Sequence, residues 1–379
     1  MFIGESKNMN LGIDISQIAH AGTGVSRFTR GLVNSILRYD KKNKWTFLFY
    51  SLRKSLEKEL ENGIRAKGHK LIVWKIPPTI VSIVSNHFRT ATAFILKNLP
   101  ALNRLDYFIT SDWIEIPINA KRVTVIHDLA YFRYPETFPD SIVNTQKNRL
   151  KWIKKESNSV VTDSSATKND LQTLLGFPEK NIKTIYPGVE VVTPDEKTIT
   201  NVLKNYNLAK PFILTVGKIE PRKNMKRLAD AFVKSKLRDI NLVIVGMKGW
   251  STYDLSIDRY IEKKNIKLLG YVDDISLFSL YRSCLFFVYP SIWEGFGYPV
   301  IEAMKSGAPV ATSNVSSLKE IGEDAALLFN PLDVDEITDS LRQMFQNVSL
   351  RKHLSTKGLE KSKQFTWKRY YDEMMKLFK

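Results

Sequence analysis

The sequence predicts an α/β protein of two doubly wound, Rossmann-like domains that face each other across a cleft. The chain has 379 residues, more than one hydrophobic core usually serves, and its 43% of hydrophobic residues are enough to build two. Short apolar segments alternate with segments of helical periodicity along the chain, which is typical of parallel sheets with helices on both faces.

The first alternation covers residues 1–190. A helix is expected at residues 25–39, and the serine pair Ser164–Ser165 is expected to cap a second helix at residues 166–176. The expected strands span residues 10–16, 45–51, 71–76, 106–110, 122–128 and 183–189, with one more inside 157–165.

The second alternation is assigned to residues 191–363, and its first part, residues 191–211, is polar and proline-marked and is interpreted as a linker. The helix expected at residues 364–379 carries an aromatic stripe, which predicts that it packs back on the first domain. The other expected elements are strands at 211–217, 241–246, 266–272, 285–291, 309–313 and 325–330, and helices at 225–235, 253–264, 275–283, 299–307 and 334–347.

The net charge of +18 is unevenly distributed, since the first 190 residues carry 28 basic and 17 acidic side chains. Such a surplus favours phosphate-bearing substrates, nucleic acid or an anionic membrane face, and an ordinary solvated basic surface is the alternative. The chain has no dense basic and aromatic tract, so we expect no nucleic-acid partner. It also has no signal peptide, no membrane-spanning apolar run and a single cysteine, which together predict a cytoplasmic protein.

The loop VGKIEPRKNM follows an expected strand and precedes an expected helix. In an open parallel sheet, ligands bind at the carboxyl ends of strands beside helix N-termini. Gly217 ends the strand, and Lys218, Arg222 and Lys223 give the loop three cations that suit a diphosphate. A solvent-exposed basic turn is the alternative interpretation.

The segment SIWEGFGYPVIEAMKSG follows another expected strand. Gly295 and Gly297 allow a ligand to approach the backbone, and the helix that begins beside them directs free N–H groups towards a phosphate. Glu294 in the loop and Glu302 in the helix can serve two parts of one ligand. Acidic residues near a helix start are also common for structural reasons, so the combination with the glycines carries the prediction.

These motifs resemble the retaining glycosyltransferase family 4, whose members have the GT-B fold. EGFGYPVIEA is similar to its signature of two glutamates around Gly-Phe-Gly, and VGKIEPRKN resembles its diphosphate-binding loop. LGYVDD, with Tyr271 and Val272, matches its base-binding strand end. IHDLAYFRYPETFP and VTDSSATKNDL resemble the first domain of members that use GDP-mannose, and the resemblance is weakest over residues 45–105.

The resemblance implies roles for the residues of the second domain. Glu294 would bind hydroxyls of the donor sugar and Glu302 the nucleotide ribose, while Arg222 and Lys223 would hold the diphosphate and stabilise its departing charge. One departure is Lys218, since the family often has arginine there, so we assign the diphosphate mainly to Arg222 and Lys223. The remaining expected donor-binding residues of this domain are Gly217, Lys218, Tyr271, Val272, Gly295, Phe296 and Gly297.

In the first domain the resemblance assigns Gly22 and Gly24 to the lining of the donor site. Their loop, HAGTGVSRFTR, is too short and irregular for a dinucleotide fingerprint by itself. His127 and Asp128 end an expected buried strand, and we interpret His127 as a contact of the donor sugar and Asp128 as a positioning residue.

The implied activity is transfer of a hexosyl group, mannosyl in this branch, from a nucleoside-diphosphate sugar with retained configuration. The acceptor would be a glycan or a lipid-linked glycan in cell-surface polysaccharide synthesis. No histidine–carboxylate cluster or DxD pair stands out, so we expect neither a metal nor another cofactor, with cations neutralising the leaving diphosphate instead. A sugar-nucleotide epimerase and a non-catalytic sugar-nucleotide-binding relative are the alternatives.

Residues 77–105 mix apolar side chains with Arg89, Lys97 and Arg104. An apolar face with a cationic rim predicts peripheral attachment to the cytoplasmic membrane face through the first domain. An ordinary pair of core helices is the alternative for the same apolar residues.

Overall fold

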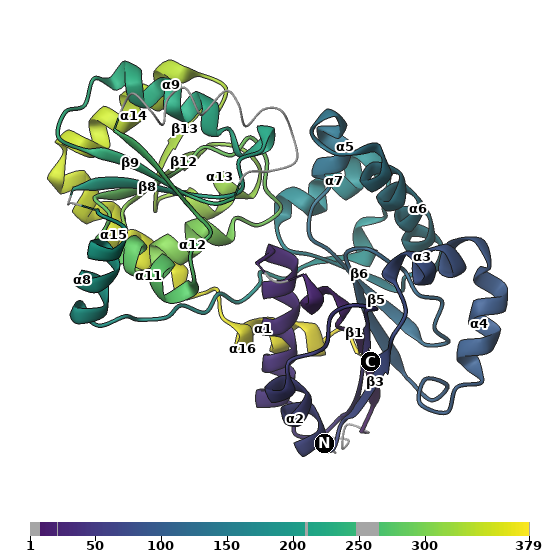
Figure 1. Cartoon of the computed structure of the whole chain (residues 1–379). Coiled ribbons are helices and arrows are strands. Elements are labelled where there is room, and N and C mark those ends of the chain that lie inside the picture. Colours follow the sequence, from purple (N-terminus) through teal and green to yellow (C-terminus); the bar gives the residue numbers. More distant parts are fainter. Residues whose placement is uncertain (1–7, 21, 209–210, 248–264, 379) are drawn as a thin grey trace, which may run out of the picture. The chain divides into compact units, whose positions relative to one another are not determined.

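The structure, a computed structural model, describes residues 8–20, 22–208, 211–247 and 265–378. It divides into two compact units, Met1–Gly188 with Trp367–Lys379, and Val189–Thr366 (Figure 1). The division falls two residues before the expected boundary at 190, and the returning segment begins at Trp367 instead of residue 364. The helix expected at residues 253–264 lies outside the described residues.

The first unit contains a sheet of seven parallel strands in the order β3-β2-β1-β4-β5-β6-β7. The chain extends the sheet in one direction from β1 to β3 and in the other from β4 to β7. Its switch point therefore lies between β1 and β4. The strands are β1 Asn10–Asp14, β2 Lys44–Tyr50, β3 Lys70–Trp74, β4 Tyr107–Ser111, β5 Lys121–Ile126, β6 Ser159–Thr162 and β7 Ile182–Thr184.

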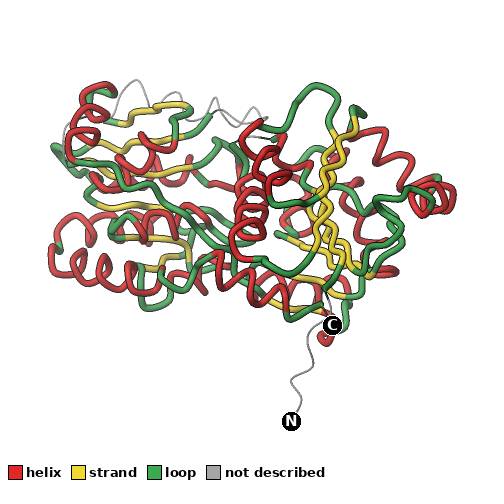
Figure 2. The backbone as a smooth tube through the Cα atoms, turned by 90° about the horizontal axis from the view of Figure 1, so that it is seen from below, coloured by secondary structure: helices red, strands yellow, loops and turns green. Residues whose placement is uncertain are grey.

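Helices lie on both sides of the strands in each unit (Figure 2). Ser164 caps α7, because its Oγ accepts the Thr167 N–H at 3.1 Å. Helix α6 was not predicted, since its buried Val143, Leu150 and Ile153 are diluted by many polar side chains. The helices of the first unit are α1 Gly24–Tyr39, α2 Lys58–Ala66, α3 Pro78–His87, α4 Arg89–Lys97, α5 Ala130–Arg133, α6 Asp140–Glu156, α7 Ser165–Leu175 and α16 Trp367–Met375.

The C-terminal helix α16 packs on α1. The rings of Trp367 and Tyr370 meet Phe28 edge to face at centroid distances of 5.7 and 5.4 Å. A Cβ atom at Gly31 would lie 2.0 Å from the Trp367 ring, so this contact requires glycine on α1. Phe365, which was expected on the same helical stripe, precedes α16 and packs on Phe296 of the second unit.

The second unit has six parallel strands in the order β10-β9-β8-β11-β12-β13, with the switch point between β8 and β11. The predicted class, α/β with two doubly wound domains, is confirmed. The strands are β8 Phe212–Val216, β9 Asn241–Val245, β10 Ile266–Gly270, β11 Phe286–Tyr289, β12 Val310–Ser313 and β13 Leu327–Phe329. The described helices are α8 Glu196–Asn205, α9 Met225–Ser235, α11 Asp274–Ser283, α12 Tyr298–Lys305, α13 Ser316–Gly322, α14 Val334–Gln346 and α15 Val348–Ser362.

The prediction of a linker at residues 191–211 was wrong in part, because α8 occupies its middle. Asp195 caps this helix by accepting the Thr198 N–H at 2.7 Å. Ile199 and Val202 are buried, and α8 contacts α11. Two buried side chains are too weak a period to be recognised in the sequence, but they suffice to dock a capped helix.

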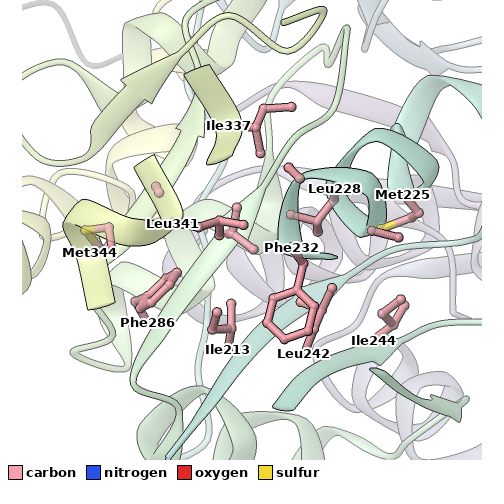
Figure 3. Packing of buried hydrophobic residues seen from close by; sticks show 14 of the residues in the cluster. Ile213, Met225, Leu228, Phe232, Leu242, Ile244, Phe286, Ile337, Leu341 and Met344 are labelled. Carbon is pink, nitrogen blue, oxygen red and sulfur yellow. The ribbon is translucent and has the colours of Figure 1, made fainter. Parts of the chain in front are cut away.

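One core of the second unit lies between its sheet and the helices α9 and α14 (Figure 3). Leu228 and Phe232 from α9 and Leu341 from α14 pack over Ile213 and Phe286 of the two central strands. This packing holds β8 and β11 side by side, and it thereby fixes the positions of the loops that follow them.

The segment containing α3 and α4 differs from the prediction at Arg89. This side chain is buried and pairs with Glu156, and its Nη1 donates to the carbonyls of Ser85 and Glu115 at 3.0 and 2.7 Å. Arg89 is therefore an internal contact of the first unit and no part of a cationic rim. Lys97 and Arg104 are exposed, and no helix of the described residues is long and apolar enough to cross a membrane.

Candidate active site

The two predicted motifs of the second unit lie at the switch point of its sheet. Strand β8 leads through Gly217 into the loop with Arg222 and Lys223, and β11 leads from Tyr289 into the loop with Glu294. Because β8 and β11 are hydrogen-bonded neighbours, both loops leave the same edge at adjacent positions.

Hydrogen bonds to backbone carbonyls join the two loops directly. The Arg222 carbonyl accepts the Ile292 N–H at 2.9 Å and the Ser291 hydroxyl at 3.1 Å. Asn224, in the left-handed conformation at φ 60°, donates from Nδ2 to the carbonyls of Pro290 and Pro331 at 3.0 and 2.6 Å. Asparagine tolerates this conformation better than most residues, so it can turn the chain into α9 and hold the second loop at once.

Glu294 lies at the centre of the site with both carboxylate oxygens occupied. Arg222 Nη1 is 2.9 Å from Oε2, and Lys223 Nζ is 2.5 Å from Oε1. The hydroxyls of Tyr289 and Ser291 donate to Oε1 at 2.9 and 2.6 Å. The structure thus brings together the three residues of this unit that the sequence nominated as catalytic.

The electrostatics of this cluster favour the ionised carboxylate. Burial by itself raises the pKa of Glu294, but the charges of Arg222 and Lys223 and the hydrogen bonds outweigh it and lower that pKa to about 2. Burial and the neighbouring Arg222 charge lower the pKa of Lys223 from its ordinary value. At neutral pH, Glu294 is therefore a fixed negative charge between two cations.

Arg222 is held from a second side as well. Its Nη2 is 3.1 Å from Glu220 Oε1, and its Nη1 donates to the Trp293 carbonyl at 2.7 Å. The positive charges of Arg222 and Lys223 balance the negative charges of Glu220 and Glu294. Lys218, earlier in the same loop, is exposed. The geometry fixes the guanidinium plane before any ligand arrives, which is the preorganisation that electrostatic catalysis requires.

The glycine-rich segment between Glu294 and α12 is buried. Gly297 has φ 96°, a backbone conformation that residues with a side chain rarely adopt, and a Cβ atom there would lie 2.8 Å from Leu318 Cδ2, which would have to move. The prediction that α12 directs free N–H groups towards a phosphate is wrong in part, because Pro299 has no N–H and the Val300 N–H donates to the Gly297 carbonyl at 3.0 Å. Gly295 and Phe296 line the same turn and are buried with it.

In the first unit, His127 follows β5 and meets a carboxylate that the sequence analysis did not nominate. The His127 Nδ1 lies 2.6 Å from the Oδ2 of Asp163, which follows β6. The neighbouring Asp128 accepts the Ala130 N–H at 3.0 Å and thereby positions α5. Burial lowers the pKa of His127, but Asp163 outweighs it and the net shift is upward. The buried Nε2 has no hydrogen-bond partner within the described residues.

Comparison with known proteins identifies the family. The sequence is 32% identical to the O-antigen chain mannosyltransferase B of Escherichia coli over 284 residues, which cover 72% of this chain and 74% of that protein. The chain belongs to glycosyltransferase family 4. Residues 24–192 match the family model described as Glycosyltransferase Family 4, and residues 199–361 match Glycosyl transferases group 1.

Other proteins similar to this glycosyltransferase include a longer relative and two solved structures that share its fold. The serotype-specific mannosyltransferase WbdA of Escherichia coli is 25% identical over 85% of this chain, which spans 40% of that protein. Among solved structures, sucrose-phosphate synthase from Thermosynechococcus elongatus has a TM-score of 0.74 at 16% identity over 98% of both chains. WaaG, a glycosyltransferase involved in lipopolysaccharide biosynthesis, has a TM-score of 0.71 at 13% identity, covering 98% of this chain and 99% of that one. These neighbours show that the glycosyltransferase has the GT-B fold.

The remaining nominated residues of the family 4 glycosyltransferase lie around the same sheet edges. Glu302 is buried in α12 and accepts the Tyr281 hydroxyl at 3.3 Å. Tyr271, 69% exposed, and the buried Val272 follow the outer strand β10. Gly22, at φ 81°, and Gly24, the first residue of α1, follow β1 in the first unit, and both are exposed.

Sequence reasoning missed the residues that support the nominated ones. Tyr289 and Ser291 bind Glu294, Glu220 binds Arg222, and Asp163 binds His127. Tyr289, Ser291 and Asp163 lie at or just beyond the carboxyl end of a predicted strand, so the rule that selected His127 could have found them. Within the described residues, no group of three or more histidine, cysteine or acidic side chains is placed to hold a metal ion.

Proposed function

We propose that this glycosyltransferase moves a mannosyl group from GDP-mannose to a glycan or lipid-linked acceptor, with retained configuration. The cluster of Glu294 with Arg222 and Lys223 carries the proposal, since it combines diphosphate-binding cations with a sugar-binding carboxylate at the switch point of one sheet. Relatives named as O-antigen mannosyltransferases support mannose and a role in surface polysaccharide synthesis.

In this proposal, the bond between the anomeric carbon and the donor's phosphate oxygen breaks as an acceptor hydroxyl attacks from the same face. The acceptor proton passes to the departing phosphate oxygen. A double displacement would need a carboxylate free to attack carbon, whereas both oxygens of Glu294 bind cations, and its pKa of about 2 makes it a weak nucleophile. Glu294 would instead bind sugar hydroxyls and hold the two cations in place.

Arg222 and Lys223 would neutralise the leaving diphosphate, so the proposal requires no metal and no cofactor. Arginine offers a planar fork and lysine a point charge to phosphate oxygens. Glu302 would bind the ribose. His127 would bind a hydroxyl of the donor sugar through its Nε2, which has no hydrogen-bond partner within the described residues. Replacing Glu302 by alanine should then raise the donor KM more than it lowers kcat.

A panel of nucleotides tests the donor. A ligand of the folded state raises the melting temperature by mass action, so GDP and GDP-mannose should stabilise the protein more than UDP and UDP-glucose. The Anabaena protein HepE, which has this fold at a TM-score of 0.72 and 15% identity, was solved with UDP and glucose, so UDP is the informative competitor. Stronger stabilisation by UDP would refute the GDP assignment, and failure of every nucleotide would refute the proposed function.

We also propose that the first unit docks on the cytoplasmic membrane face through α3 and α4. Large apolar side chains are exposed there, with Phe88 62%, Phe94 70% and Ile95 60% accessible. Lys97 and Lys155 line an adjoining pocket of about 400 Å³ together with Phe94 and Trp152. Cations beside exposed apolar side chains suit the interface of an anionic bilayer.

Sedimentation with vesicles tests this docking. Binding should require anionic lipid, weaken in high salt and decrease when Phe88 and Phe94 are replaced by serine. Lys97→Gln should weaken it further, whereas Lys352→Gln on α15 is the matched control and should leave it unchanged. Absence of binding to anionic vesicles at low salt would refute the membrane proposal without affecting the catalytic one.

A further inference from the structure

A groove lies on the surface of the first unit, between α6, α5 and the C-terminal end of α7 (Figure 1). Its volume of about 430 Å³ is within the roughly 300–1,000 Å³ that is usual for ligand sites. The floor is the edge of an apolar cluster, in which Leu150 and Phe177 are 4% and 5% exposed. Phe132 and Leu175 are half-buried on the same cluster. The floor is thus apolar and recessed between the helices, and we call this site the α6 groove.

Three lysines of α6 form one side of the groove. Lys147, Lys151 and Lys154 are exposed and recur every three or four residues, so they share one face of the helix. The Lys147 Nζ lies 5.9 Å from the centre of the Phe132 ring. The Lys154 Nζ lies 5.9 Å from the centre of the Phe177 ring. Because these two lysines are two helical turns apart, the groove extends for about 10 Å along α6, with an aromatic ring near each end.

The positive charge of this helix face is not neutralised within the unit. The lining contains no acidic residue, and no ion pair involves the three lysines in the part of the chain that the structure describes. Lys168 of the neighbouring α7, in contrast, pairs with Glu179 at 2.8 Å. Lysines three and four residues apart on a helix repel each other. The groove therefore presents a concentration of like charges that an acidic ligand would neutralise.

The distribution of these charges favours an extended acidic ligand over a single phosphate. Phosphate sites bring cations and helix N-termini to one point. Here the cations are spread along the helix, and the end of α7 beside them is a C-terminus, where the Leu175 carbonyl accepts Lys154 Nζ at 2.8 Å. The last carbonyls of a helix carry partial negative charge and disfavour a compact anion. Several carboxylates in a row match the spread of the lysines.

The recessed floor distinguishes the α6 groove from the surface of α3 and α4 that we propose to meet the membrane. At that surface Phe88 and Phe94 protrude and are 62% and 70% exposed, which suits insertion into a bilayer. In the groove, the apolar Leu150 and Phe177 are reached only by side chains that project into it. An amphipathic helix supplies such side chains, because its apolar residues at positions i, i+4 and i+7 cover about the same 10 Å.

From these observations we infer that the α6 groove docks an acidic amphipathic helix of a partner protein. Apolar side chains of that helix would occupy the floor between the Phe132 and Phe177 rings, and its glutamates or aspartates would pair with the three lysines. None of the residues nominated for donor binding or catalysis lines the groove. Docking there would therefore attach the glycosyltransferase to another protein without occupying its donor site.

Fluorescence anisotropy with the full chain tests this inference. The probe is a labelled helical peptide of about 16 residues, with leucines at positions i, i+4 and i+7 and glutamates on either side of them. At about 0.15 M salt, where long-range charge effects are screened, it should bind about tenfold more tightly than a scrambled peptide of the same composition. A peptide with lysines in place of the glutamates should bind more weakly than both.

Two groove variants and one control locate the binding. Lys147→Glu combined with Lys151→Glu should weaken the Kd of the acidic peptide by about tenfold and improve that of the lysine peptide. Asn148→Trp, at an exposed position of the lining, should fill the groove and weaken the Kd of the acidic peptide to a similar extent. Lys197→Glu combined with Lys204→Glu, at exposed positions of α8, is the matched control and should leave the Kd within about twofold of wild type.

The inference is overturned if the acidic peptide binds no more tightly than the scrambled one, or if both groove variants keep the wild-type Kd. Sedimentation of the same variants with anionic vesicles tests a bilayer as the occupant instead. If the charge reversal abolishes vesicle binding but leaves peptide binding unchanged, the groove faces lipid and the inference is wrong. Peptide binding that depends on the groove lysines, with vesicle binding retained in the charge-reversed variant, supports it.

Discussion

The substitution Glu294→Gln tests the charge cluster of the second unit most directly, because glutamine mimics the protonated carboxyl in shape. Lowering the pKa of Glu294 from 4.5 to about 2 corresponds to about 3 kcal/mol of stability at neutral pH. A depressed carboxyl pKa contributes stability above pH 4.5, and this contribution is lost as the pH falls towards 2. Glu294→Gln should therefore destabilise the folded protein by about 3 kcal/mol at pH 7, which lowers the melting temperature by roughly 6–12 °C.

The assay is urea unfolding at pH 7 and at acid pH, followed by far-UV circular dichroism. The difference between variant and wild type should shrink as the pH falls below 4.5, because protonation then makes the wild-type side chain neutral as well. Glu360→Gln on the exposed face of α15 is the matched control and should stay within about 0.5 kcal/mol of wild type. If Glu294→Gln lowered the free energy of unfolding by less than about 1 kcal/mol at pH 7, Arg222 and Lys223 would not hold Glu294 as the geometry requires.

Three further variants test other parts of the structure. Arg222→Ala combined with Lys223→Ala should lower kcat by at least roughly 100- to 1,000-fold, the usual loss for one charge-stabilising donor, in a donor-hydrolysis assay. Asp14→Asn should raise stability at pH 7.5 by up to about 3 kcal/mol, because burial raises the pKa of Asp14 from 3.8 to about 6. The wild type should accordingly gain stability from this group as the pH falls from 6 towards 4, and the variant should lose that slope in urea unfolding. Gly31→Ala places Cβ 2.0 Å from the Trp367 ring and should cost about 1–3 kcal/mol, measured by thermal unfolding.

Each of these has its own control and its own contrary result. Wild-type turnover in the double alanine variant would refute the diphosphate assignment. The control Asp339→Asn, at an exposed site, should leave the pH dependence of the free energy of unfolding unchanged. If Asp14→Asn kept the pH dependence of the wild type, the raised pKa of the buried Asp14 would be contradicted. Gly63→Ala on α2 has room for its Cβ, with the nearest atom 3.7 Å away, so it should stabilise by up to about 1 kcal/mol. If Gly31→Ala and Gly63→Ala changed the stability in the same direction, the packing of α16 on α1 would be contradicted.

The sequence came close to the site because its signals are local. The cations after β8 and the glutamate after β11 follow glycine-marked strand ends, and any parallel sheet brings such ends to one edge. The resemblance to family 4 rests on the same short motifs. Tyr289, Ser291 and Asp163 lie at strand ends of the same kind and could have been nominated, but the sequence has no pattern that shows which of them binds Glu294 or His127.

Where the sequence misled, long-range packing was responsible. Arg89 is a cation in an apolar segment and was expected at a membrane rim, yet Glu156, 67 residues later, pairs with it inside the first unit. Residues 191–211 were expected to form a linker, yet burial of Ile199 and Val202 against α11 stabilises a helix there. In both places, contact with a residue or helix far along the chain stabilises a local structure that the sequence segment alone does not predict.

The sequence by itself determined the α/β class, two doubly wound domains, and the loops with the cations and glutamates, because alternation, glycine placement and strand-end chemistry are written in consecutive residues. Only the tertiary structure decided that Glu294 binds both Arg222 and Lys223 and that Asp163 orients His127. The physical reason is that pKa values, unpaired polar atoms and cavities depend on distances between residues far apart in the chain. Those distances are set by the order and packing of the strands.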